Sequence, residues 1–192
     1  MTASAGPSAA VFLDRDGTII EDVTYLGRPE EVRLLPRAAE GIAVLNRSGL
    51  PVIVATNQSV VGRGMIDVAM LDAIHARLRD VIAAAGALVD AIYICPHHPD
   101  EGCECRKPRP GLLLQAAAER NLDLAASFMV GDRPLDILAG QAAGCRTVLV
   151  ETGPPGAWDE AAGAVPDFRA PDLYEAAVWI VAATREEGHL VS

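Results

Sequence analysis

Two aspartates separated by one position, Asp14 and Asp16, follow an apolar run and precede Gly17. Residues two apart in extended backbone point to the same side, and a glycine lets the chain turn sharply after them. Two converging carboxylates repel one another unless a cation or a shared proton intervenes. Asp132, which follows a later apolar run, can supply a further oxygen ligand. The pattern indicates a Mg²⁺ site, because Mg²⁺ takes oxygen ligands and keeps waters for a substrate phosphate.

A second group of side chains lies in one short segment: Cys95, His97, Cys103 and Cys105. Three thiols and an imidazole are typical ligands of tetrahedral Zn²⁺, and a full set of protein ligands indicates a structural rather than a catalytic metal. His97 is favoured over the adjacent His98, because it gives both ligand pairs one intervening residue. A disulfide is the alternative, and it is disfavoured by the strain of bridging cysteines two apart.

Five apolar runs of strand length alternate with longer stretches in which apolar residues recur at helical spacing. The runs cover residues 10–13, 52–55, 91–95, 128–130 and 147–150. This alternation predicts a three-layer α/β fold, a Rossmann-like parallel sheet with helices on both faces. Functional residues of such sheets gather at the carboxyl ends of the strands. Polar, reactive residues directly follow the first four runs, so we expect them at one edge of the sheet.

Residues that start and stop helices mark the stretches between the runs. The expected helices cover residues 36–49, 110–120, 134–144 and about 173–187, and one more begins after Asp67 as its N-cap. Residues 152–171 are rich in Gly, Pro and Ala and are predicted to form a long loop. No insertion of domain size follows the first or the third run. We therefore expect an open site without a large cap domain.

Length and composition limit the class of protein. A chain of 192 residues fits one domain spanning residues 1–192, since chains usually divide only beyond about 250 to 300 residues. Asp and Glu number 26 against 16 Lys and Arg, without a basic cluster, which argues against a nucleic-acid partner. No apolar run can span a bilayer, and residues 1–10 lack the charged start of a secretory signal. We expect a cytoplasmic monomer without a membrane partner.

Four ordered motifs resemble those of haloacid-dehalogenase-type (HAD) phosphatases: Asp14-Arg15-Asp16-Gly17-Thr18, Thr56-Asn57-Gln58-Ser59, Lys107, and Gly131-Asp132. The resemblance implies that Asp14 attacks phosphorus to form an aspartyl-phosphate. Asp16 would protonate the leaving oxygen and then deprotonate the hydrolytic water. Mg²⁺ on Asp14, the Asp16 backbone carbonyl and Asp132 would offset the developing charge. Thr56 and Lys107 would donate to phosphoryl oxygens. Asp136 lies one helical turn beyond Asp132, a position from which it would only support the metal site or cap a helix.

The zinc loop, residues 95–105, runs directly into Arg106 and Lys107, and with residues 56–59 and 62–64 it is similar to the heptose 1,7-bisphosphate phosphatase subgroup. This likeness implies release of the 7-phosphate of D-glycero-D-manno-heptose 1,7-bisphosphate. Histidinol phosphate or another small phosphorylated sugar is the alternative substrate. The implied substrate-binding residues are Asp14, Arg15, Asp16, Asp22, Val23, Thr24, Tyr25, Thr56, Asn57, Gln58, Ser59, Arg106, Lys107 and Arg133. Arg63 and Arg109 are as consistent with solvated surface residues as with phosphate ligands.

A different class of protein also combines clustered aspartates, Mg²⁺, a threonine and a lysine. A receiver-like phosphoacceptor holds a phosphoryl group without turning over substrate, and a zinc-stabilised binding module is another non-enzymatic alternative. The placement of Asp16 beside Asp14 favours a hydrolase. Lys107 is the only lysine in the chain, at a position where a compact ammonium rather than a planar guanidinium would reach a phosphoryl group.

Overall fold

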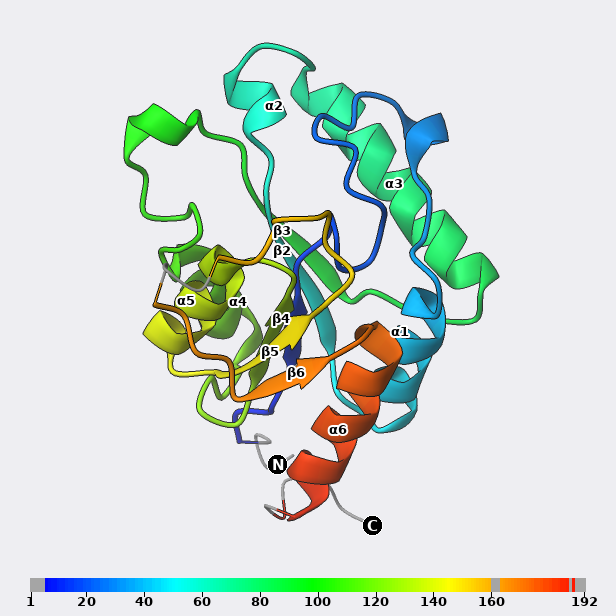
Figure 1. The fold of residues 1–192 in the computed structure, drawn as a ribbon, viewed down its shortest axis with the longest axis vertical. Helices are drawn as coiled ribbons and strands as arrows, with labels where there is room; N and C mark the ends of the chain where they lie inside the picture. The colour runs from blue at the N-terminus through cyan, green and yellow to red at the C-terminus, as the bar shows by residue number, and fades with distance from the viewer. Residues whose placement is uncertain (1–5, 160–162, 187, 189–192) are drawn as a thin grey trace, which may run out of the picture.

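The computed structural model describes residues 6–159, 163–186 and 188 of the chain. Six parallel strands form one sheet in the order β3-β2-β1-β4-β5-β6. The strands are β1 (Val11–Leu13), β2 (Val52–Asn57), β3 (Ala91–Cys95), β4 (Phe128–Gly131), β5 (Arg146–Val150) and β6 (Phe168–Ala170). β1 lies between β2 and β4, in the middle of the sheet (Figure 1). The predicted parallel α/β sheet is confirmed.

Helices cover both faces of the sheet (Figure 1). Residues of α1 (Ala38–Arg47), α3 (Val68–Ala84) and α6 (Leu173–Glu186) form the core on one face, and α4 (Gly111–Arg120) and α5 (Pro134–Ala143) cover the other. Side chains of a strand alternate between its two faces. In β1, Val11 and Leu13 therefore join the first core while Phe12 packs with α4. The two-sided burial explains why β1 is a continuous apolar run.

Most predicted boundaries agree with the structure to within two residues. Asp67 caps α3 as predicted, and its carboxylate accepts the Met70 N–H at 2.8 Å. The expectation of an unbroken loop over residues 152–171 is wrong, because β6 pairs with β5 there. The short helix α2 (Ser59–Gly62) was also not predicted. The closing helix was expected to reach about residue 187, which lies outside the described residues.

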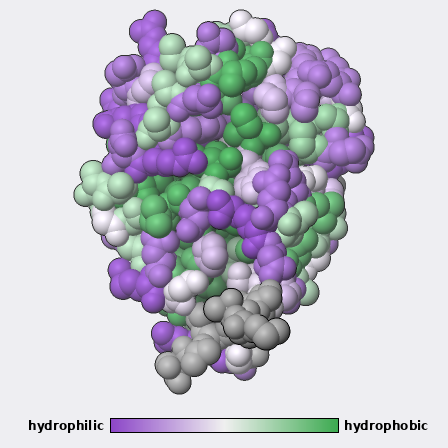
Figure 2. All heavy atoms as spheres, turned by 180° about the vertical axis from the view of Figure 1, so that it is seen from behind, coloured by the Kyte–Doolittle hydropathy of each residue, from purple (hydrophilic) through white to green (hydrophobic). Residues whose placement is uncertain are grey.

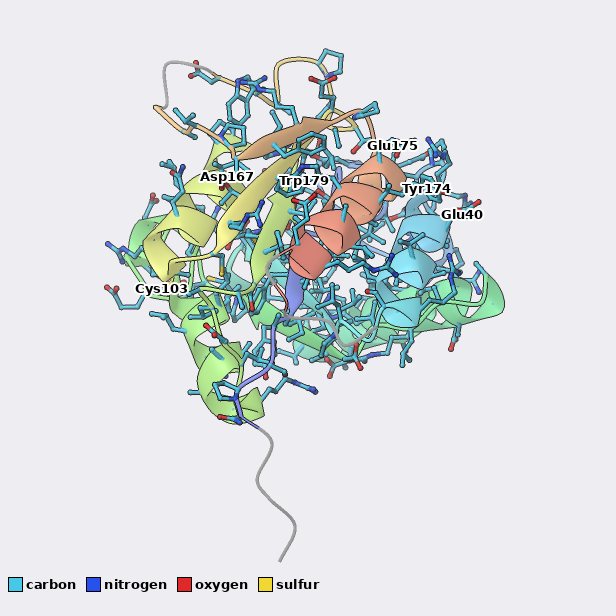
Figure 3. All side chains as sticks on the ribbon, turned by 90° about the horizontal axis from the view of Figure 1, so that it is seen from below. Glu40, Cys103, Asp167, Tyr174, Glu175 and Trp179 are labelled. Carbon is cyan, nitrogen blue, oxygen red and sulfur yellow. The ribbon has the colours of Figure 1, made fainter. Side chains whose placement is uncertain are left out.

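Packing against α6 explains why so short a strand as β6 forms. The Phe168 ring of β6 stacks on the Trp179 ring of α6 with centroids 4.6 Å apart, and Trp179 lies beside the sheet in Figure 3. At the start of α6, Arg37 pairs with Asp172 at 2.8 Å and with Glu175 at 2.9 Å. These contacts join α6 to both β6 and the start of α1.

The connections at the carboxyl edge contain little helix or strand. Residues 14–37, after β1, contain only the 3₁₀ helix η1 (Pro29–Glu31), and residues 96–110, after β3, contain only η2 (Pro99–Glu101). As predicted, no domain-sized cap stands over this edge in the described ranges. Seen from behind, the surface mixes hydrophilic residues with smaller hydrophobic areas (Figure 2). No described helix is long and apolar enough to cross a membrane.

Candidate active site

A cavity of about 260 Å³ opens at the carboxyl ends of β1, β2 and β4. Its lining includes every predicted substrate-binding residue except Val23, which is exposed. The lining residues are Asp14, Arg15, Asp16, Asp22, Thr24, Tyr25, Leu26, Thr56, Asn57, Gln58, Ser59, Val60, Arg106, Lys107, Arg133 and Leu135. The parallel pairing of β1 with β2 and with β4 brings these distant segments together. The apolar members Leu26, Val60 and Leu135 were not predicted.

Three buried carboxylates meet beside this cavity. One carboxylate oxygen from each of Asp14, Asp132 and Asp136 lies within 4.8 Å of the others. The Lys107 ammonium donates to Asp14 Oδ1 at 2.7 Å and to the Ala55 carbonyl at 2.7 Å, and it pairs with Asp136 Oδ1 at 2.6 Å. One ammonium therefore pairs with two of the three carboxylates, Asp14 and Asp136.

Burial and crowding shift the protonation equilibria of this cluster. Burial, followed by the charges of Asp14 and Asp136, raises the pKa of Asp132 to about 8. Burial and Asp136 also raise the pKa of Asp14, against the opposing effect of Lys107. Burial alone would lower the pKa of Lys107, but Asp136 and Asp14 raise it above its ordinary value. The ammonium is charged, and the carboxylates need a further cation to be charged together.

The surroundings of Asp132 fit such a cation. Its Oδ2 atom accepts no hydrogen bond although the residue is 2% exposed, and it lies 3.6 Å from Arg133 Nε. Gly17 and Gly153 flank this oxygen so closely that a Cβ atom on either would collide with it. Gly17 also has a φ of +84°, which favours glycine. A cluster made only of oxygen ligands is the donor set that Mg²⁺ prefers.

Asp16 is oriented differently from Asp14 and lies outside this carboxylate cluster. Its Oδ1 accepts from Arg15 Nη2 at 2.9 Å, and its Oδ2 accepts from Gln58 Nε2 at 2.9 Å. Gln58 Nε2 also donates to Thr56 Oγ1 at 2.8 Å. Because the Thr56 oxygen accepts that bond, its own hydrogen stays available for a ligand in the cavity. Burial raises the pKa of Asp16, while Arg15 lowers it.

The arginines of the predicted site differ in what they contact. Arg133 pairs with Asp22 at 2.5 Å across the cavity, and the Arg106 Nη1 atom is buried without a hydrogen-bond partner. Arg109 instead donates to the carbonyls of Gly102 and Cys103 and so braces the cysteine loop. Arg63 is exposed and outside the cavity lining. Arg106 therefore has an unpartnered donor atom, whereas Arg133 is already paired with Asp22.

The cysteine loop brings its four predicted ligands together. Cys95 Sγ lies 3.5 Å from Cys103 Sγ, and Cys105 Sγ lies 3.5 Å from Cys103 Sγ and 3.1 Å from His97 Nδ1. Tetrahedral zinc with Zn–S bonds of about 2.3 Å needs S–S separations of about 3.8 Å. His97 is the imidazole of this cluster, whereas His98 accepts the Asp100 N–H and caps η2. The free thiols are close to the geometry of a zinc site.

Two residues have a larger part in this arrangement than the sequence indicates. Asp136 was expected only to support the metal site or cap a helix. It accepts the Arg133 N–H at 3.1 Å at the start of α5, and its other oxygen pairs with Lys107. His75 of α3 was not predicted, and it reaches Arg15 at 3.2 Å. The sequence does carry one indication of this residue, a histidine on the otherwise apolar face of α3.

Comparisons with known proteins agree with this geometry. Residues 104–176 match a family model described as "HAD-hyrolase-like". The D-glycero-beta-D-manno-heptose-1,7-bisphosphate 7-phosphatase of Pseudomonas aeruginosa is 45% identical over 144 residues, which are 74% of this chain and 81% of that protein. The D-glycero-D-manno-heptose-1,7-bisphosphate 7-phosphatase of Thermosynechococcus vestitus is 39% identical over 190 residues, 91% of this chain and 96% of that protein.

A solved structure extends the comparison to the fold. The D,D-heptose 1,7-bisphosphate phosphatase of B. bronchiseptica, complexed with magnesium and phosphate, superposes with a TM-score of 0.84 at 38% identity, covering 91% of this chain and 99% of that one. Three observations point to the same family: the fold, the clustered carboxylates beside a buried lysine, and the sequence identity over most of the chain. The chain belongs to the HAD family and is a phosphatase of that family.

Proposed function

We propose that the protein removes the 7-phosphate of D-glycero-D-manno-heptose 1,7-bisphosphate with the help of Mg²⁺. The observation that carries the proposal is one cavity lined by Asp14, Lys107 and Arg106, with the carboxylate cluster directly beside it and the Nη1 atom of Arg106 unpaired. The relatives named for this reaction support the choice of substrate. A bisphosphate needs one phosphate at the reacting carboxylate and a second at a cationic side chain, and the cavity offers both.

Asp14 is the proposed nucleophile. It attacks phosphorus, the bond to the leaving oxygen breaks, and an aspartyl-phosphate forms. The Lys107 ammonium donates a hydrogen bond to Asp14 Oδ1. As the carboxylate loses its charge, the same N–H can donate to a phosphoryl oxygen instead. The Thr56 hydroxyl, with its oxygen already accepting from Gln58, donates to another. Each of these groups stabilises charge that develops during the transfer.

Asp16 is the proposed general acid and base. Its carboxyl proton passes to the leaving oxygen, and the resulting carboxylate then takes a proton from the water that hydrolyses the aspartyl-phosphate. Its side chain is 24% exposed at the cavity, so it can reach both. Mg²⁺ would be held by Asp14, Asp132 and the Asp16 backbone carbonyl, with Asp136 behind them. When bound, it offsets the negative charge of carboxylates and phosphate.

The expected response to Mg²⁺ depends on pH through Asp132. Its pKa is about 8 in the folded protein against an ordinary value of 3.8, so the metal-free native state binds the extra proton between these values. The stability of the metal-free protein should therefore fall as the pH rises from about 4 to 8. Mg²⁺ at about 100 times its dissociation constant adds about 2.7 kcal/mol, a Tm gain of about 5–10 °C for a chain of this size.

Thermal unfolding with and without Mg²⁺ at pH 5.5 and pH 8 measures this effect. The Tm gain should be larger at pH 8, where Mg²⁺ competes with fewer protons at Asp132. The Asp132→Asn variant is the matched control and should lose most of the gain at both pH values. A Tm gain that is equal at the two pH values would contradict the proposed metal site.

The substrate is tested by comparing kcat/KM for both anomers of the heptose bisphosphate, fructose 1,6-bisphosphate and histidinol phosphate. We expect the heptose bisphosphate to be preferred, and multiple turnover excludes a receiver-like role.

The Arg106→Met variant should raise KM for bisphosphates by about 10- to 100-fold, the loss of about 1.5–3 kcal/mol from one charged hydrogen bond. Arg63→Met, which changes an exposed arginine outside the cavity, is its control. A preference for histidinol phosphate would overturn the proposed substrate.

We also propose that Cys95, His97, Cys103 and Cys105 hold a structural Zn²⁺. Burial, followed by Cys95 and Cys103, raises the pKa of Cys105 to about 12. Three thiolates at these distances therefore need a cation to coexist. The loop leads directly into Arg106 and Lys107, and Asn57 fixes that turn by accepting from Lys107 N and donating to Lys107 O, both at 3.1 Å. Zinc would thus hold two site residues in place.

Metal analysis of the purified protein is expected to find one zinc per chain. Cys103→Ser should lose this zinc and lower both Tm and kcat, because the loop carrying Lys107 is released. Cys145→Ser is the matched control, since Cys145 is buried away from the cluster and should leave the zinc content unchanged. Zinc retained at full occupancy in Cys103→Ser would refute the ligand assignment.

A further inference from the structure

One buried titratable residue near the site has no part in the proposed mechanism. His75 lies on α3 and is 5% exposed, among the apolar residues Leu71, Ile74 and Leu78 that this helix turns toward the sheet. Its Nε2 atom is 3.2 Å from Arg15 Nη1. Burial of a polar ring at an otherwise apolar helix face costs free energy unless the ring is hydrogen-bonded. The hydrogen bond with Arg15 therefore offsets the cost of burying the His75 ring.

The direction of this hydrogen bond follows from the chemistry of the two groups. A guanidinium has donors only, so His75 Nε2 accepts from Arg15 and the ring proton must sit on Nδ1. Burial, followed by the charges of Arg15 and Arg79, lowers the pKa of His75 to about 3. The ring is therefore neutral at physiological pH. His75 acts as a fixed acceptor at one end of Arg15.

The rest of the Arg15 guanidinium is directed at Asp16. Nε and Nη2 both donate to Asp16 Oδ1, at 3.2 and 2.9 Å, and Nη2 also donates to Gln58 Oε1 at 2.9 Å. Arg15 is 1% exposed although the motif places it next to the cavity. Its guanidinium is thus held at three points, by a helix on one side and by two residues of the site on the other.

We propose that His75 is a positioning residue that, through Arg15, holds the carboxyl group of Asp16 in place to protonate the leaving oxygen. The inference rests on the role proposed above for Asp16. Without the acceptor on α3, Arg15 Nη1 would be a buried donor lacking its partner, and the guanidinium would turn to find another. Asp16 would then lose the hydrogen bonds from Arg15 Nε and Nη2 that orient its carboxyl group. A displacement of about 1 Å in a reacting group can cost about 100-fold in rate.

A merely structural role for His75 makes a different prediction. Loss of packing lowers stability and affects all substrates alike. Loss of orientation at Asp16 affects only substrates whose leaving group must be protonated. An alkyl phosphate such as fructose 1,6-bisphosphate releases a basic alkoxide and needs the proton, whereas p-nitrophenyl phosphate releases a stabilised phenolate and does not. Since kcat/KM covers only the steps up to release of the leaving group, it isolates this step.

The test compares His75→Leu with His75→Gln on these two substrates. His75→Leu should lower kcat/KM for the alkyl phosphate by about 10- to 100-fold and for p-nitrophenyl phosphate by less than about threefold. His75→Gln keeps an acceptor near the position of Nε2 and should stay close to the unmodified protein on both. If His75→Leu does not fold, His75→Met, whose sulfur is only a weak acceptor, takes its place.

Two controls separate the possible failures. Leu78→Ala, at a fully buried position of the same helix, should lower Tm without changing the ratio of the two kcat/KM values. Asp16→Asn should show the selective loss in full. Suppose that Asp16→Asn lowers kcat/KM mainly for the alkyl phosphate, but that His75→Leu lowers kcat/KM equally for both substrates or for neither. The positioning role is then wrong and the proposed function stands. If Asp16→Asn itself is not selective, both the role of Asp16 and the inference built on it fail.

Discussion

Replacing Asp14 with asparagine is expected to lower kcat by at least about 10⁴-fold, the scale of losing a catalytic nucleophile. The amide oxygen cannot form the aspartyl-phosphate, while the side chain keeps its size and still fits its buried position. The other groups that we propose to bind phosphate, Thr56, Arg106 and Lys107, are unchanged, so substrate affinity should change far less than kcat. Phosphate release under saturating substrate and Mg²⁺ measures the effect.

The same variant should fold as well as the unmodified protein. Asp14 is one of three crowded carboxylates, and Lys107 keeps its pairing with Asp136 at 2.6 Å when Asp14 becomes neutral. Removal of one negative charge relieves repulsion, so Tm should stay the same or rise. Asp67→Asn is the matched control, because asparagine also caps a helix and Asp67 lies outside the cavity. Phosphate release at the normal rate by Asp14→Asn would exclude Asp14 as the nucleophile.

Replacing Lys107 with methionine is expected to reduce both activity and stability. Lys107 is 2% exposed and its ammonium pairs with Asp14 and Asp136, so its removal leaves two buried carboxylates without their cation. Removing one partner of a buried ion pair costs about 3–5 kcal/mol of unfolding free energy. Loss of a charge-stabilising donor lowers kcat by about 10²- to 10³-fold. Urea unfolding and steady-state kinetics on one preparation measure the two effects separately.

Lys107→Arg is the informative companion variant. It restores the positive charge, so part of the lost stability should return. The guanidinium is planar and broad, whereas the three partners of the ammonium all lie within 2.7 Å of one nitrogen atom. We therefore expect kcat to stay low. Full kcat in Lys107→Arg would mean that the single lysine of this chain occupies its position by chance.

Much of the fold is predictable from local patterns, because the strands of a buried parallel sheet are continuous apolar runs with sharp ends. Asp14 and Asp132 stand next to such ends, and their convergence follows once β1 and β4 are neighbours. The three-residue strand β6 is not predictable in this way. It depends on pairing with β5 and on the stacking of Phe168 against Trp179, two contacts with elements outside the strand itself.

The type of chemistry can be inferred from the order of the motifs, because carboxylates, a hydroxyl and one lysine occur in turn after successive apolar runs. How these groups pair with one another depends on contacts between segments that lie far apart in the chain. Asp136 joins the carboxylates because α5 begins beside β4, and Lys107 lies between Asp136 and Asp14. His75 reaches Arg15 across 60 positions of the chain. Such contacts depend on how helices pack onto the sheet, and a helix shows in its own sequence which face is buried but not which residue that face will meet.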